Sequence, residues 1–125
     1  MMPSDASPST AALVRLEAVV RPEVLDRVIH ALRDGGAVRL TVMHAHAIGA
    51  GADPETAKLS MLEGSAFAEV AVVQVVCPAA QARKLTDAML GAAHTGRRGD
   101  GIVVESSVRS VVKIRTGAVG PEALA

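Results

Sequence analysis

The stretch from Phe67 to Val76 is the strongest strand signal in the chain and constrains its fold more than any other segment. It has the sequence Phe-Ala-Glu-Val-Ala-Val-Val-Gln-Val-Val, and β-branched residues at this density favour a pleated sheet. Phe67 is also the one aromatic residue of the chain. The core must therefore be packed from aliphatic side chains, and such a core favours further burial against sister subunits.

Other periodic segments surround this strand. Proline is well placed at the first position of a helix, so Pro22 and Pro78 are predicted to begin two helices, the first of which ends at Gly35-Gly36. The predicted strands are Val14–Val20, Ala37–Ala47, Phe67–Val76, Ile102–Glu105 and Val108–Ile114. This β-α-β-β-α-β order predicts an α+β fold, the ferredoxin-like sandwich with two helices on one face of an antiparallel sheet. The other face has no cover and few polar residues, so we expect oligomerisation to bury it.

Composition excludes several classes of protein. Lys+Arg 13 balances Asp+Glu 13, which argues against a nucleic-acid partner. Cys77 is the single cysteine, so no internal disulfide forms, and we interpret it as a small buried hydrophobe in a reducing compartment. The longest charge-free run, Val70–Ala82, is too short to span a bilayer, which takes roughly 20 residues. Residues 1–12 resemble a disordered tail more than a signal peptide, so we expect a cytoplasmic protein with no transmembrane segment.

Glycine and charge are concentrated in Thr95–Gly101, between an expected helix and an expected strand. The sequence Thr-Gly-Arg-Arg-Gly-Asp-Gly allows backbone N–H groups to turn inward and form an anion-binding nest beside two arginines. This pattern predicts a phosphate-binding turn. A solvated surface loop is the alternative interpretation.

The segment Ile48–Gly64 has no sustained period and is long for a loop, which is typical of functional loops. A short helix over Pro54–Leu62 is predicted within it, with Asp53 as its N-cap. Before this segment, His44 and His46 share one face of a strand and could hold a metal. No third ligand is evident, so we interpret them as half-exposed strand histidines and predict no metal site.

Several of these segments together resemble the PII signal-transduction proteins, the nitrogen regulatory family. The likeness runs without a gap from about residue 13 to residue 117, leaving 118–125 as a C-terminal tail. Ile48–Gly64 corresponds to the family's T-loop, Thr95–Gly101 to its B-loop and Val112–Gly117 to its C-loop. The remaining matching segments are Glu17–Pro22, Leu40–Val42 and Val75–Pro78.

The resemblance implies a homotrimer that binds ATP or ADP between subunits as a regulatory ligand, with no obligatory cofactor. Gly99, Asp100 and Gly101 would meet the phosphates. Lys113 and Arg115 would reach the phosphates from the neighbouring subunit. Thr41 and the backbone near Val76 would lie by the adenine, with Gly49 at the root of the T-loop, which docks onto target proteins.

The sequence also departs from the family pattern. Ile102 replaces a phosphate-binding lysine, and Lys113 replaces an arginine and so loses its bidentate fork. We therefore expect weakened phosphate binding, or a preference for fewer phosphates. Positions that serve 2-oxoglutarate or the γ-phosphate in the family are Ala50, Gly51 and Val70 here. A dicarboxylate would lack partners to offset its desolvation, so we expect no normal 2-oxoglutarate sensing.

The tyrosine that is uridylylated in some members is absent, because the chain has no Tyr and Glu63 stands at that position. The sequence thus predicts a PII-like, non-enzymatic regulator that binds an adenine nucleotide (ATP or ADP, or AMP) and controls an unknown target through its T-loop. The alternative is a PII-fold trimer that has lost nucleotide binding and acts as a constitutive interaction scaffold.

Overall fold

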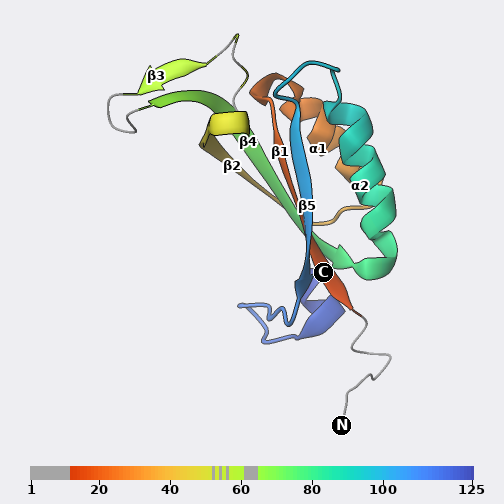
Figure 1. Ribbon diagram of the computed structural model, residues 1–125. Helices are drawn as coiled ribbons and strands as arrows, with labels where there is room; N and C mark the ends of the chain where they lie inside the picture. The colour runs from red at the N-terminus through yellow and green to blue at the C-terminus, as the bar shows by residue number, and fades with distance from the viewer. Residues whose placement is uncertain (1–11, 52, 54, 56, 61–64) are drawn as a thin grey trace.

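The computed structural model describes residues 12–51, 53, 55, 57–60 and 65–125. Its sheet has the strand order β2-β4-β1-β5, with β3 paired to β4, and every pairing is antiparallel. The strands are β1 (Leu13–Val20), β2 (Leu40–Ile48), β3 (Lys58–Ser60), β4 (Ser65–Pro78) and β5 (Gly101–Val108). Helices α1 (Leu25–Asp34) and α2 (Ala79–Ala93) lie on one face of the sheet (Figure 1). The predicted ferredoxin-like arrangement is confirmed.

The core lies between the sheet and the two helices. Side chains alternate across a strand, so Leu16 and Ala18 of β1 face the helices, where both are 0% exposed. Val73 and Val75 are their partners on β4 and belong to the same buried cluster, to which α1 and α2 also contribute. Cys77 is buried in this cluster, and burial raises the pKa of its thiol. The interpretation of Cys77 as a buried hydrophobe is confirmed.

In the described part of the chain neither α1 nor α2 covers the opposite face of the sheet, as predicted, but this face is more polar than the sequence pattern indicates. Register places Thr41, Gln74 and Glu17 side by side on β2, β4 and β1, and Gln74 Nε2 donates to Glu17 Oε1 at 2.6 Å. Apolar side chains lie beside this polar row, with Met43 43% and Ile102 62% exposed. The open face therefore combines an apolar band with a polar one.

Two local predictions are wrong. The predicted strand Val108–Ile114 does not form: β5 is one strand that ends at Val108, and Val112 makes only an isolated bridge to Val119. The predicted helix over residues 54–62 is contradicted by β3, which pairs residues 58–60 with β4. Because β4 begins at Ser65, before the predicted Phe67, it offers an edge on which β3 forms.

The end of the chain is folded onto the domain. The sequence pattern places the end of the ordered core at Gly117, yet Gly120–Leu124 forms a short 3₁₀ helix. Ala123 and Leu124 are 1% and 8% exposed. The predicted N-terminal tail lies outside the described residues except for Ala12. Among the helices of the described part of the chain, none has the length and apolar character to cross a membrane.

Candidate functional site

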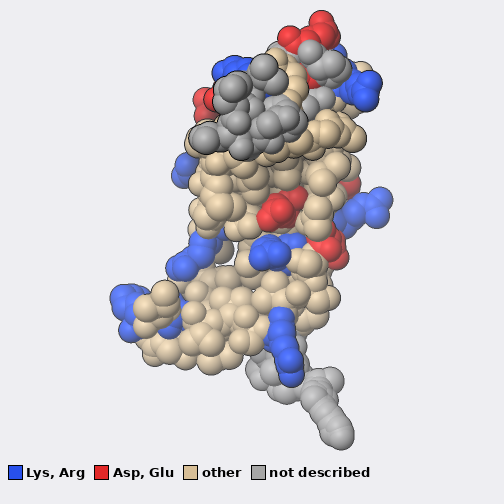
Figure 2. Space-filling model, turned by 60° about the vertical axis from the view of Figure 1, so that its left-hand side comes forward, with Lys and Arg blue, Asp and Glu red and all other residues tan. Residues whose placement is uncertain are grey.

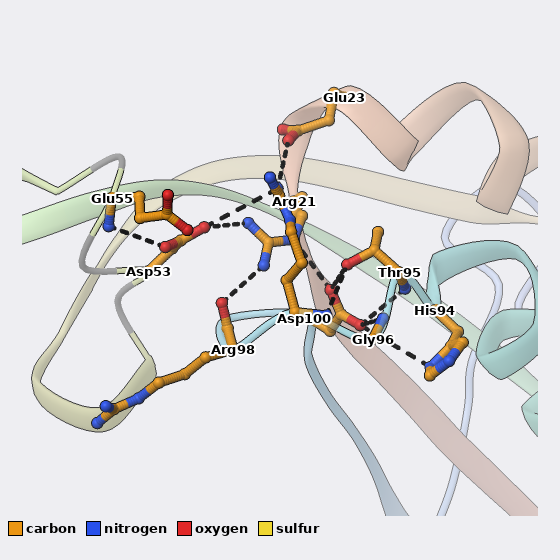
Figure 3. Close-up of polar contacts among 10 residues, drawn as sticks. Arg21, Glu23, Asp53, Glu55, His94, Thr95, Gly96, Arg98 and Asp100 are labelled. Atoms are coloured by element: carbon orange, nitrogen blue, oxygen red, sulfur yellow. Dashed lines mark hydrogen bonds and ion pairs between the residues drawn. The ribbon is translucent and has the colours of Figure 1, made fainter.

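The B-loop is organised by the carboxylate of Asp100. Its Oδ2 accepts hydrogen bonds from the backbone N–H groups of Thr95 at 2.7 Å and Gly96 at 2.9 Å, and Oδ1 accepts from the Thr95 hydroxyl (Figure 3). These bonds to Thr95, chiefly, hold the pKa of Asp100 far below its usual range. The nest predicted from the sequence therefore exists in part, but its first N–H groups bind an anion from the loop itself.

Arg21 connects this loop to the T-loop. Its guanidinium donates to Asp53 Oδ2 at 2.5 Å, to Asp100 Oδ1 at 3.0 Å and to the backbone oxygen of Arg98 at 2.7 Å. Arg21 is 4% exposed and the Asp53 side chain 5%, so both charges are removed from water as a pair. The hydrogen bond from Arg21, followed by one from the backbone of Glu55, lowers the pKa of Asp53.

No sequence pattern identifies this network. Asp53 is predicted to cap a helix, and its Oδ1 does accept the Glu55 N–H at 2.9 Å, but no helix follows. The local signal is a lone arginine between the apolar end of a strand and a proline, Val20-Arg21-Pro22. Arg97 and Arg98 are the two arginines that the sequence predicts to add positive charge for a ligand. The Arg97 side chain instead lies 3.8 Å from Glu23 and 3.9 Å from Asp53, and the backbone oxygen of Arg98 accepts the hydrogen bond from Arg21.

Two glycines of the B-loop are required by close approach of other atoms. Gly99 has φ +99°, and a Cβ there would lie 2.8 Å from the Cβ of Asp53. Gly101 has φ +105°, and its Cβ would lie 1.7 Å from the carbonyl oxygen of Val19. Real Cβ atoms do not tolerate such distances. The lack of a side chain at Gly99 thus leaves room for Asp53 of the T-loop, and its lack at Gly101 allows β5 to pair with β1.

Four other predicted site residues line one pocket. Thr41, Val76, Lys113 and Arg115 surround a cavity of about 390 Å³ on the open side of the sheet. The remaining lining residues are Arg15, Arg39, Gln74, Val111, Val112, Ile114, Ala123 and Leu124. We call it the C-loop pocket. The structure thus brings these four predicted residues together, including two from the sheet and two from the C-loop.

The B-loop lies at the start of β5, whereas the C-loop pocket lies near the other end of this strand. Gly101 is paired with Val20, whereas Val108, at the other end of β5, is paired with Leu13. Figure 1 shows the loop at the top of the sheet and the C-terminal segments at the bottom. Within one chain, Gly99, Asp100 and Gly101 therefore lie far from the C-loop pocket. Gly49, with φ +85°, begins a short 3₁₀ turn after β2 and lines neither region.

The charged side chains in the lining of the C-loop pocket are all basic. Arg15, Arg39, Lys113 and Arg115 line it, and no Asp or Glu does. Lys113 Nζ donates to the backbone oxygen of Ala125. The three arginines make no ion pair and no side-chain hydrogen bond within the described part of the chain. In Figure 2 the lower part of this side of the molecule carries Lys and Arg side chains, and the visible acidic side chains lie higher.

The groove beside the B-loop is different in character. It lies between α2 and β5 and has a volume of about 540 Å³. Asp100 and His94 are its polar residues, and Ile102, the residue that replaces the family's lysine, is among the apolar ones. The lining of this groove includes no Lys or Arg.

The two strand histidines lie on one face of β2, opposite Ala71 and Glu69 of β4. The ring of His46 stacks on Phe67 with 3.9 Å between centroids. Among the described residues, no group of three or more His, Cys, Asp or Glu side chains could hold a metal ion. We propose no metal site at His44 and His46.

Comparisons with known proteins identify the family of this chain. The family described as Nitrogen regulatory protein P-II matches residues 13–118. The P-II protein of Rhizobium meliloti is 32% identical over 114 residues, covering 88% of this chain and 98% of the relative. The regulatory protein GlnK2 of Haloferax mediterranei is 33% identical over 126 residues, covering 97% and 99%.

Solved structures show the same fold. B. subtilis GlnK superposes with a TM-score of 0.74 at 24% identity, covering 91% of this chain and all of that one. A GlnK–ATP complex from B. subtilis superposes with a TM-score of 0.72 over 90% of this chain and 98% of the other. The matched family covers the sheet, both helices, the B-loop and the C-loop. The chain therefore belongs to the nitrogen regulatory protein P-II family.

Proposed function

We propose that this chain is a trimeric P-II regulator that binds an adenine nucleotide between subunits and controls a target protein through its T-loop. One observation carries the proposal. Thr41, Val76, Lys113 and Arg115 line a single pocket, although they come from two strands and a loop far apart in the sequence. The similar GlnK–ATP complex from B. subtilis supports ATP as the regulatory ligand, and ADP, which shares its base, ribose and first two phosphates, is the alternative.

The distance between the two loops supports a site shared by subunits. The B-loop and the C-loop pocket lie at opposite ends of β5. A second chain that lays its open sheet face on the first would bring its own B-loop to this pocket. The exposed apolar band that includes Met43 and Ile102 supplies a driving force for such assembly.

The T-loop departures and the missing tyrosine shape the rest of the proposal. The carboxylates of Asp53 in the T-loop and Asp100 in the B-loop both accept hydrogen bonds from Arg21, and Gly51 and Val70 supply no polar side chain for a dicarboxylate. We infer regulation by nucleotide without normal 2-oxoglutarate sensing and without uridylylation. Nucleotide binding would compete with, or rearrange, the contacts that hold Asp53.

Titration calorimetry with ATP, ADP, AMP and 2-oxoglutarate tests this function. We expect heat from at least one adenine nucleotide and none from 2-oxoglutarate. Arg115→Gln should weaken nucleotide binding about tenfold, the loss of one charge-assisted contact, whereas Arg109→Gln, which removes an exposed charge outside the pocket lining, should not. Absence of heat from every nucleotide at millimolar concentration, or a monomer by light scattering, would contradict the proposal.

A constitutive scaffold is the second candidate, and a specific observation favours it. Lys113 is held by the backbone oxygen of Ala125, and the groove beside the B-loop presents Ile102 in place of a lysine. Both features reduce the charge available to a phosphate. A trimer that gives no heat with any nucleotide would support this candidate over the first.

A further inference from the structure

The C-loop pocket gathers four basic side chains from different parts of the chain. Lys113 and Arg115 come from the C-loop, where phosphate contacts are proposed, but Arg15 and Arg39 come from the sheet and its edge. These last two belong to none of the motifs by which the chain resembles its family. Their presence in the same lining therefore needs its own explanation.

Register fixes where the two additional arginines stand. Arg15 of β1 is paired with Val76 of β4. Arg39 directly precedes Leu40, whose partner on β4 is Val75, so it lies on the other side of Val76. Neighbouring strands are about 4.8 Å apart, which separates the two arginine Cα atoms by roughly 10 Å across the sheet. The two side chains flank Val76 within one pocket.

Neither arginine is used by the fold. Both are exposed, and neither makes an ion pair or a side-chain hydrogen bond within the described part of the chain. The nearest acidic side chain along β1, Glu17, accepts a hydrogen bond from Gln74. Arg21 shows the contrast, because its guanidinium donates to two carboxylates and a carbonyl oxygen. Like charges around one pocket repel one another until an anion binds.

We infer that the C-loop pocket takes a nucleotide with two separated anionic groups: a 5′-phosphate chain held by Lys113 and Arg115, and a second phosphate on the ribose held by Arg15 and Arg39. This inference rests on the proposed function, which places the base near Val76. A 2′- or 3′-phosphate lies closer to the base than the end of a 5′-diphosphate does. It can therefore reach the arginines that flank Val76, where a planar guanidinium binds phosphate in a bidentate manner.

Calorimetry with three matched probes tests the inference. ADP and adenosine 3′,5′-bisphosphate both carry two phosphate groups and differ in where the second is attached, and adenosine 2′,5′-bisphosphate places it on the neighbouring hydroxyl. We expect one of the bisphosphates to bind about tenfold more tightly than ADP, the value of one charge-assisted contact. Arg15→Gln and Arg39→Gln should each remove this preference, because each should weaken the favoured bisphosphate about tenfold more than it weakens ADP.

The control variant is Arg27→Gln, which removes the same charge from an exposed position of α1 outside the pocket. It should keep the preference intact, and thermal unfolding should show that all three variants fold. Binding of ADP as tight as that of both bisphosphates would overturn this inference alone. Tighter binding of GDP, with no bisphosphate preference, would also overturn it, because the arginines would then recognise a base edge. Absence of binding heat from every nucleotide would overturn both this inference and the proposed function.

Discussion

Charged side chains have different surroundings at the two ends of β5. At the B-loop end, Arg21 is buried and its guanidinium is shared between Asp53 and Asp100. At the C-loop end, Arg15, Arg39 and Arg115 converge on one pocket without an acidic partner in its lining. A buried charge needs an oppositely charged partner because its removal from water is costly. An exposed cation is solvated by water and is stable without such a partner. The B-loop end therefore pairs its charges within the chain, whereas the C-loop end leaves three arginines exposed to solvent and accessible to a ligand.

The largest expected effect comes from Gly101→Ala at the B-loop end. The new Cβ would lie 1.7 Å from the Val19 carbonyl oxygen, and neither strand can move without breaking the β1–β5 pairing. We expect a loss of more than about 4 kcal/mol in the free energy of unfolding, at the extreme of single substitutions. Loss of the cooperative transition in chemical denaturation would show it.

Gly117→Ala is the matched control at the C-loop end. Gly117 also has a positive φ, +76°, but a Cβ added there would meet no atom within 4 Å. The cost should be about 1 kcal/mol, from backbone strain alone. Similar losses in the two variants would contradict the view that only the B-loop end is tightly packed.

The next effect in size is that of Arg21→Ala. Removing one partner of a buried ion pair leaves the others as uncompensated charges, which costs about 3 kcal/mol. Asp53 and Asp100 would lose their shared cation, and the T-loop would lose its attachment to Arg98 through Arg21. Urea denaturation measures the loss. Arg15→Ala, at the exposed end, should change the stability by less than about 0.5 kcal/mol.

These differences show what a sequence can and cannot predict. The sheet and helices follow from local apolar spacing, and the glycine pattern located the B-loop, because both signals lie within a few residues. The partners of Arg21 are 32 and 79 residues away, so no local pattern links them. The position of Arg39 beside Val76 depends on the register of β2 against β4. The helix predicted over residues 54–62 failed because pairing with β4 outweighed a local capping signal.

Acid should weaken the B-loop end selectively. The folded-state pKa values of Asp53 and Asp100 lie below those of ordinary carboxyls, so their contribution to stability is complete above the unfolded value of about 3.9. It is lost as the pH falls below that value and protonates them in the folded protein. Asp53→Asn should be less stable than the wild type at pH 7 and should lose less stability between pH 5 and pH 2. Parallel pH profiles would contradict a role for Asp53 in this loss.

The smallest effect should come from Arg39→Gln at the C-loop end, and its sign is opposite. Without ligand, Arg39 lies roughly 10 Å across the sheet from Arg15, and two like charges at that separation in water repel by about 0.4 kcal/mol before salt screens them. The variant should therefore be about 0.3 kcal/mol more stable than the wild type in low salt. The gain should vanish in 1 M NaCl, where the screening length is about 3 Å. Arg27→Gln, measured in parallel, should show no such salt-dependent gain. Destabilisation by Arg39→Gln at low salt would mean that Arg39 already has a partner in the folded protein, and the contrast between the two ends of β5 would fail at this residue.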